Sequence, residues 1–250
     1  MPNRRERIIN NEIYHIVHKR GGDGLMFKDI DDYYRGIFSI YEFNTSKPVI
    51  IRERRKARNK IKKIKGRTFD FDSRVEPLVE VLAFCLMPNH IHLVLRQLKD
   101  GGISKFMAKF GTGYSTYFYE KYKLRGKGYF FQGRFKSIHI ENNEQFRIVF
   151  VYVHTNPIAI LKSGWKEKGI SNSDKVIKFL ENYKWSSYAD FIGGKNFPSL
   201  IATSKEDILN IMGGQDGCKE FIRNWVEYKG EIRGQRENQG FNNFQDFYLE

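Results

Sequence analysis

The hydrophobic positions of the chain follow two periods, one typical of strands and one typical of helices. Short apolar runs of strand character occur at residues 13–19, 79–87, 91–95 and 129–140. Apolar residues at helical spacing occur at residues 30–43, 102–123 and 142–156. Pro157 ends the last of these helices, because proline cannot donate the next hydrogen bond. The predicted order is therefore β-α-β-β-α-β-α.

This order favours an α+β fold of the ferredoxin-like type. Pro88 and Asn89 separate two apolar runs and provide turn chemistry, so these runs are expected to form a hairpin. A split βαβ arrangement gives an antiparallel sheet, which we expect to have its helices packed on one face.

The last third of the chain has a different character. Helical patterns at 175–183, 185–192 and 204–228 predict a small helical appendage, and residues 231–250 are polar, as in a loosely ordered tail. We therefore expect a first domain at 1–160, with an insertion at about 45–75, and a C-terminal helical extension with a tail at 161–250.

Charge indicates the kind of partner. The 250 residues carry a formal net charge of +14, which favours a polyanion. Within the insertion, residues 52–67 contain Glu53 as their only acid, a pattern that repels itself unless phosphates are near. The residues predicted here to contact DNA include Arg52, Arg54, Arg55, Lys56 and Arg58. A solvated helix or a disordered loop is the alternative interpretation.

The two cysteines, Cys85 and Cys218, support neither a disulfide framework nor a cysteine metal cluster. A reducing compartment fits, so we expect a cytoplasmic, nucleoid-associated protein. The first residues lead into no apolar signal region, and no run approaches the roughly 18 apolar residues of a membrane span. Neither secretion nor membrane insertion is expected.

Two short patterns suggest chemistry. His90 and His92 are two apart on a predicted strand, so both imidazoles project from one face while Ile91 turns inward. Tyr152 and Asn156 are four apart and share one flank of a predicted helix. Each pattern also has an ordinary interpretation, namely a chance histidine pair, an amphipathic tyrosine and a helix-end asparagine.

Arg134 and Lys136 flank Phe135 on the last predicted strand. Alternation would place both cations on one face, where they could hold phosphates. A solvated sheet edge explains the same pattern equally well.

In combination, these motifs resemble those of the single-tyrosine HUH transposases and, among them, the REP-associated tyrosine transposases. The blocks that carry the resemblance are Tyr14 to Val17, Met87 to Leu93, Phe131 to Ser137, Tyr152 to Pro157 and Trp185 to Tyr188. The chain departs from the family pattern in the basic insertion at 52–67 and around residues 164–178.

The resemblance implies an RRM-like HUH endonuclease domain. It also implies that His90, His92 and Asn156 bind a divalent metal, Mg²⁺ or Mn²⁺, and that Tyr152 is the nucleophile. The implied partner is single-stranded DNA with a REP-like hairpin and a short flanking guide sequence, handled by a monomer or a homodimer. His154 points away from this flank and is expected to be structural, so the base that accepts the Tyr152 proton is not identified.

Three functions are compatible with the sequence. The first is a metal-dependent strand transferase that cleaves beside hairpins through a 5′-phosphotyrosine intermediate and rejoins strands. The second is a catalytically silent regulator that binds hairpins through its basic surface. The third is a metal-dependent nuclease that uses water and needs His90 and His92 but not Tyr152.

Overall fold

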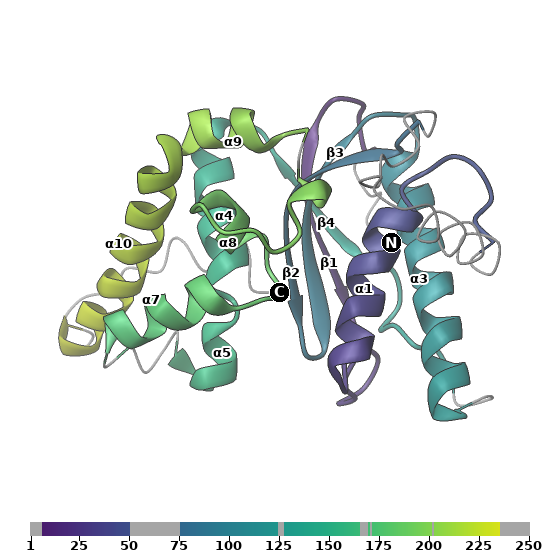
Figure 1. Ribbon diagram of the computed structural model, residues 1–250, viewed down its shortest axis with the longest axis horizontal. Helices are drawn as coiled ribbons and strands as arrows, with labels where there is room; N and C mark the ends of the chain where they lie inside the picture. The colour runs from purple at the N-terminus through teal and green to yellow at the C-terminus, as the bar shows by residue number, and fades with distance from the viewer. Residues whose placement is uncertain are drawn as a thin grey trace, which may run out of the picture.

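A four-stranded antiparallel sheet forms the centre of the computed structural model (Figure 1). The structure describes residues 7–50, 76–124, 128–165, 170, 172–201 and 203–235, with side chains of the last helix described to Tyr228. The strands are β1 (Ile13–Lys19), β2 (Val79–Met87), β3 (His90–Gln97) and β4 (Lys136–Ile140), in the order β2-β3-β1-β4. This sheet and the β-α-β-β-α-β-α order confirm the predicted α+β fold class.

Helices cover both faces of the sheet, whereas the sequence pattern predicted them on one face (Figure 1). Helices α1 (Ile30–Glu42) and α3 (Gly102–Tyr122) pack on the face that carries Leu86 and His18. Helix α4 (Asn143–Thr155) lies on the opposite face, where Tyr152 contacts His92. The difference arises because the order of the elements along the chain does not say on which face of the sheet each helix packs.

The C-terminal part of the chain extends the layer formed by α4 (Figure 1). Its elements are α5 (Ile158–Leu161), α7 (Ser173–Asn182), α8 (Tyr188–Phe191), the 3₁₀ helix η1 (Pro198–Leu200), α9 (Lys205–Met212) and α10 (Gly214–Gln235). Tyr183, Phe191, Ile201 and Cys218 belong to the same buried cluster as the sheet. The appendage therefore completes the core of the first part of the chain.

Most predicted elements are found within a few residues of their expected limits. Strand β4 is shorter than the predicted 129–140, because Gly133 has φ of 102° and interrupts the extended backbone. The predicted helical segment 204–228 is two helices, since Gly213 and Gly214 have φ of 78° and 82°. Helix α10 continues to Gln235, and the rest of the predicted tail lies outside the described residues.

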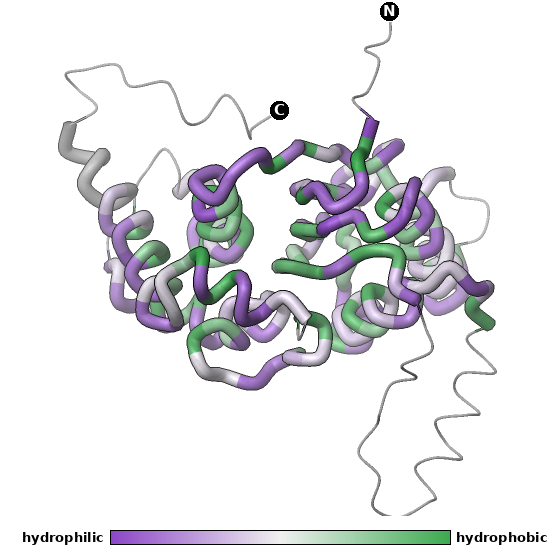
Figure 2. Tube along the Cα trace, turned by 90° about the horizontal axis from the view of Figure 1, so that it is seen from above, coloured by the Kyte–Doolittle hydropathy of each residue, from purple (hydrophilic) through white to green (hydrophobic). Residues whose placement is uncertain are grey.

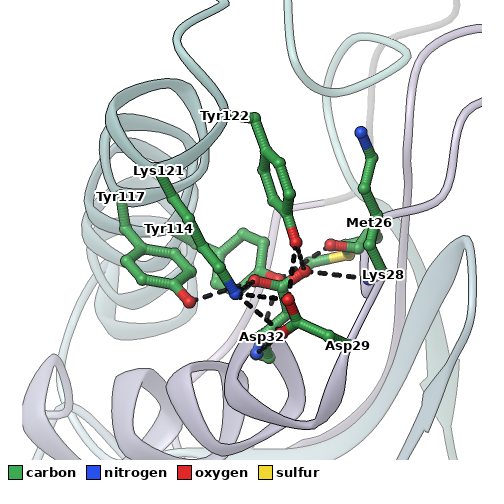
Figure 3. Close-up of polar contacts among 8 residues, drawn as sticks. All are labelled: Met26, Lys28, Asp29, Asp32, Tyr114, Tyr117, Lys121 and Tyr122. Carbon is green, nitrogen blue, oxygen red and sulfur yellow. Dashed lines mark hydrogen bonds and ion pairs between the residues drawn. The ribbon is translucent and has the colours of Figure 1, made fainter.

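A buried carboxylate joins α1 to α3 (Figure 3). Asp32 is fully buried and accepts hydrogen bonds from Tyr117 at 3.0 Å and Tyr122 at 2.7 Å, and Lys121 forms an ion pair with it at 2.8 Å. Asp29 caps α1 by accepting from the Asp32 amide, and it also pairs with Lys121. Because every partner comes from α3 or the start of α1, the network fixes how these helices meet.

The outer edge of β2 is covered by a segment of the appendage. The Leu86 amide donates to the Trp185 carbonyl at 2.8 Å, and the Ser187 amide donates to the Phe84 carbonyl at 3.0 Å. Trp185 to Ser187 thus pass beside the strand as a turn with a single bridge between Ser186 and Cys85, although the sequence pattern predicted a helix over 185–192 and only α8 is helical there. This pairing protects an edge that would otherwise expose unpaired backbone groups.

Hydrophobic strand positions lie between the two helical layers, and the outer helices are more hydrophilic (Figure 2). In the part of the chain that the structure describes, no helix combines the length and the apolar character needed to cross a membrane.

Candidate active site

The two histidines of β3 lie together at the hairpin end of the sheet. Their ring centroids are 4.7 Å apart at an interplanar angle of 81°. His90 is half-buried and His92 is buried, while Ile91 between them is fully buried against the opposite layer. The predicted placement of both imidazoles on one face is therefore confirmed.

The Nδ1 atom of each imidazole is held by a neighbour. Asn89 Oδ1 accepts from His90 Nδ1 at 2.6 Å, and His92 Nδ1 is hydrogen-bonded to His15 Nε2 at 3.0 Å. His15 and His92 also stack, with centroids 5.2 Å apart. Partners of this kind fix the orientation and tautomer of an imidazole ring, and here each ring is held through Nδ1.

Sequence reasoning did not assign a role to His15. Its signal was the opening-strand block at 14–17, but contact with His92 depends on the register between β1 and β3. In that register Val17 is opposite His92, which places His15 diagonally beside it on the same face. Burial lowers the pKa of His15 to about 4, so its ring is neutral at pH 7.

Helix α4 brings a phenol against this histidine group. The Tyr152 ring centroid lies 5.5 Å from that of His92 and 5.7 Å from that of His15, both in edge-on geometry. Asn156, one turn further along, is buried and donates from Nδ2 to the Tyr152 carbonyl at 2.7 Å. The structure therefore brings Tyr152 to the histidines and places Asn156 beside it on the same helix.

The environment of Tyr152 keeps its phenol group protonated. Burial raises the pKa of the phenol, and a hydrogen bond with Asn156 acts in the opposite direction. At neutral pH the side chain is therefore a phenol, and its use as a nucleophile requires a proton acceptor or a nearby positive charge.

His154 anchors α4 to the sheet. Its ring is fully buried, and Nε2 is hydrogen-bonded to Ser187 Oγ at 2.9 Å. Ser187 Oγ in turn accepts from the Phe84 amide of β2 at 3.0 Å. Because His154 lies between Tyr152 and Asn156 on α4, this connection sets their position relative to the strands, in keeping with the expected structural role.

The predicted DNA-contacting cations are spread over different places. Arg52, Arg54, Arg55, Lys56 and Arg58 lie outside the described residues. Arg134 precedes β4 and lines a groove of about 340 Å³ with Arg7, Phe135 and the first turn of α3. Lys136 is the first residue of β4 and lies opposite Val17, on the face of the histidines. Arg134 and Lys136 are thus not a regular alternating pair, since only Lys136 belongs to the strand.

Among the described residues, no group of three or more His, Cys, Asp or Glu side chains is placed to hold a metal ion. A metal at this site would therefore take the two Nε2 atoms and a non-acidic donor. The amide oxygen of Asn156 is of the chemical class that suits Mg²⁺ and Mn²⁺.

Comparison with protein families gives the chain a context. Residues 49–156 match the family model described as "Transposase IS200 like". The chain resembles the IS200-like transposases. The matched segment contains His90, His92, Tyr152 and Asn156, so all four residues of the candidate site lie within the part that is similar to the IS200-like family. The match confirms the resemblance that the motifs indicate.

One solved structure is also similar to the chain. It is a REP-associated tyrosine transposase bound to a REP hairpin, with 14% sequence identity and a TM-score of 0.43, and the alignment covers 80% of this chain and 90% of that one. No curated protein matched the chain.

Proposed function

We propose that this IS200-like chain is a single-strand DNA transposase that cleaves and rejoins strands beside DNA hairpins. The observation that carries the proposal is the contact of Tyr152 with the histidine pair: the ring centroids of His90 and His92 are 4.7 Å apart, and those of His92 and Tyr152 are 5.5 Å apart. A net charge of +14 supports a nucleic acid as the substrate.

Tyr152 has the role of nucleophile in this proposal. Its phenolic oxygen attacks the scissile phosphorus, the bond from phosphorus to the 3′ oxygen breaks, and a 5′-phosphotyrosine link forms. The phenolic proton passes to solvent, and the departing 3′ oxygen takes up a proton. Because one phosphodiester is exchanged for another, a DNA 3′ hydroxyl can reverse the step without ATP.

The residues around the tyrosine fit a divalent cation, Mg²⁺ or Mn²⁺. Since both histidine Nδ1 atoms are engaged, His90 and His92 would bind it through Nε2 and Asn156 through its amide oxygen. When bound, the cation would neutralise charge on the scissile phosphate and on the departing oxygen. His15 and Asn89 would hold the two imidazoles in the required tautomers.

An unpaired strand is the substrate that suits this geometry. The attacking Tyr152 lies on a half-buried flank of α4. In-line attack on a DNA phosphate therefore requires one DNA strand to leave the duplex and lie across the sheet. We infer that a hairpin with a short flanking guide sequence presents that strand, as the resemblance to the REP-associated transposases implies.

The His90→Ala variant tests the proposal. Loss of one neutral ligand should reduce cleavage of a labelled single-stranded hairpin, taken from the DNA flanking the gene, by more than the ~10–100-fold typical of losing an outer partner. Hairpin affinity should change little, because the basic surface is intact. The matched control is His139→Ala, since His139 pairs with Glu12 away from the site.

The outcomes separate the alternatives. Cleavage in Mg²⁺ or Mn²⁺ that is lost in His90→Ala and kept in His139→Ala supports the proposal. Equal loss of binding and cleavage in His90→Ala would contradict the site assignment. Binding without cleavage by the wild type, across hairpins that include its own flanking DNA, would favour the silent regulator.

A further inference from the structure

The face of the sheet that carries the histidines is covered at one end and open at the other. Among the residues of β4 on this face, Lys136 is exposed, Ile138 is half-buried and Ile140 is buried. Burial rises toward Ile140 because α4 begins at Asn143, immediately beyond the strand.

At the opposite end of the sheet, four side chains of this face remain accessible. Val17 and His90 are half-buried, and Lys19 and Lys136 are exposed. We call Val17, Lys19, His90 and Lys136 the open strip. It runs from the histidine site across β1 to the edge strand β4.

Strand register fixes the order of residues along the open strip. Lys19 is the direct cross-strand partner of His90, and Val17 lies between His92 on one side and Lys136 on the other. Directly paired residues have Cβ atoms about 5 Å apart, and neighbouring strands are about 4.8 Å apart. Lys19 is therefore one strand from the site, and Lys136 is about 10 Å from His92 across two strand spacings.

The two lysines are not neutralised locally. Within the described part of the chain, neither Lys19 nor Lys136 forms an ion pair, whereas Arg96 pairs with Glu80 and Lys121 with Asp32. An uncompensated ammonium on a flexible stem is well suited to hold a phosphate as a point charge. Two of them on the face of the candidate site, one beside His90 and one across β1 from His92, define a direction for a polyanion.

We propose that the single strand enters the site along the open strip, with Lys19 holding the phosphate next to the scissile one and Lys136 holding a phosphate further along the same strand. The inference rests on the proposed function and adds a positioning role for Lys19, which no sequence motif indicated. Val17 provides a small apolar surface between the two cations, so that the sugar-phosphate backbone can cross the sheet at close range.

The experiment compares Lys19→Gln and Lys136→Gln with the matched control Lys178→Gln. Lys178 is exposed on α7, in the appendage, and forms no ion pair among the described residues. Salt dependence of binding to a labelled hairpin with a single-stranded flank is measured for the full chain. If a substituted lysine binds one phosphate, the slope of log affinity against log salt should fall by about 0.7, the value for single strands.

Uncharged phosphate analogues in the DNA then show which phosphate each lysine contacts. A series of oligonucleotides carries one methylphosphonate at successive positions of the flank, and adduct formation is measured with each. The neutral position next to the scissile phosphate should slow the wild type by about tenfold, equivalent to about 1.4 kcal/mol, but should have little further effect on Lys19→Gln. The corresponding position for Lys136→Gln should lie further from the scissile bond.

Two results would overturn the open strip as the path of the strand. One is a Lys19→Gln variant that matches Lys178→Gln in salt slope and in the methylphosphonate series. The other is an interference position that stays the same in Lys19→Gln as in the wild type. If the wild type forms no adduct at all, the proposed chemistry fails, and the salt slopes still decide whether the strand lies on the open strip.

Discussion

At the residue scale, burial and local hydrogen bonds decide what each histidine can do. His15 and Asn89 are hydrogen-bonded to the Nδ1 atoms of His92 and His90, which fixes the orientation of both rings. His18, on the other face of the same strand, stacks on Phe131 with centroids 3.7 Å apart and is hydrogen-bonded to the Gly133 carbonyl at 3.2 Å. The two faces of β1 thus use histidine for different purposes.

His18 makes stability depend on pH. Burial lowers its pKa to about 4, against a partial opposing effect of the bond to Gly133, while in the unfolded chain its pKa is about 6.5. The unfolded state therefore binds more protons between these values, so the stabilisation is complete above pH 6.5 and is lost as pH falls toward 4. His18 alone should contribute at most about 1.4 kcal/mol per pH unit in this range.

Denaturant unfolding at pH 7.5, 6 and 5 measures this effect. The His18→Gln variant should show a shallower decline in the free energy of unfolding than the wild type, because one titrating ring is removed. Parallel declines in the two proteins would show that His18 is not protonated on unfolding in this range.

At the element scale, close approach of helices depends on particular glycines of α3. A Cβ atom at Gly113 would lie 2.1 Å from the ring of Phe43, at the end of α1. A Cβ atom at Gly111 would meet Phe131 at an ordinary 3.6 Å. Both positions are interior to the same helix, so their neighbours alone distinguish them.

Alanine at these positions should therefore have opposite effects. Gly113→Ala should destabilise the protein by roughly 1–3 kcal/mol through overpacking against Phe43. Gly111→Ala should stabilise it by roughly 0.5–1 kcal/mol, because alanine is the better helix former and has room. Thermal or denaturant unfolding of both variants checks this, and an equal sign for the two changes would contradict the described packing.

The elements were largely predictable from local pattern, and the exceptions have local causes. The apolar run from Val79 to Met87 and its turn at Pro88 gave the hairpin, because both signals lie within one short segment. The positive φ of Gly133, which shortens β4, and the hydrogen bonds of Trp185 and Ser187 to β2 involve partners far away in the chain. Such interactions override local propensity.

The residues of the candidate site were more predictable than the neighbouring residues that contact them. His90 and His92 follow from strand alternation, and Tyr152 and Asn156 from helical spacing. The contact of His15 with His92 and the position of Lys19 opposite His90 follow only from the β1 to β3 register. Register is set by the packed sheet as a whole and is not encoded in either strand alone.

At the scale of the whole molecule, the appendage and the sheet form one core. Tyr183, Phe191, Ile201 and Cys218 are buried in the cluster that contains the strands. Ser187 connects α4 to β2 through His154, and Trp185 covers the β2 edge. The division of the chain near residue 160 remains a prediction about domain organisation, and these interactions make a fragment ending there incomplete.

A fragment of residues 1–160 should therefore fail to fold cooperatively. It loses the apolar partners of the sheet and the cover of the β2 edge, so aggregation through that edge is expected. A fragment of residues 1–235, which keeps every described element, is the control and should unfold in one cooperative transition. Near-ultraviolet circular dichroism and denaturant unfolding measure both fragments. A native-like, cooperative 1–160 fragment would establish an independent domain.

A nucleophilic Tyr152 would become covalently joined to DNA. The most direct measurement mixes the full chain with labelled single-stranded hairpin DNA in Mg²⁺ or Mn²⁺ and looks for an adduct that resists denaturant. Tyr152→Phe is compared with Tyr228→Phe. Tyr228 lies on α10, and its side chain is exposed, with a relative exposure of 54% for the residue. We expect the adduct in the wild type and in Tyr228→Phe, with the phosphate mapped to Tyr152, and none in Tyr152→Phe. Cleavage that persists without an adduct in Tyr152→Phe would contradict the account and show that water is the nucleophile.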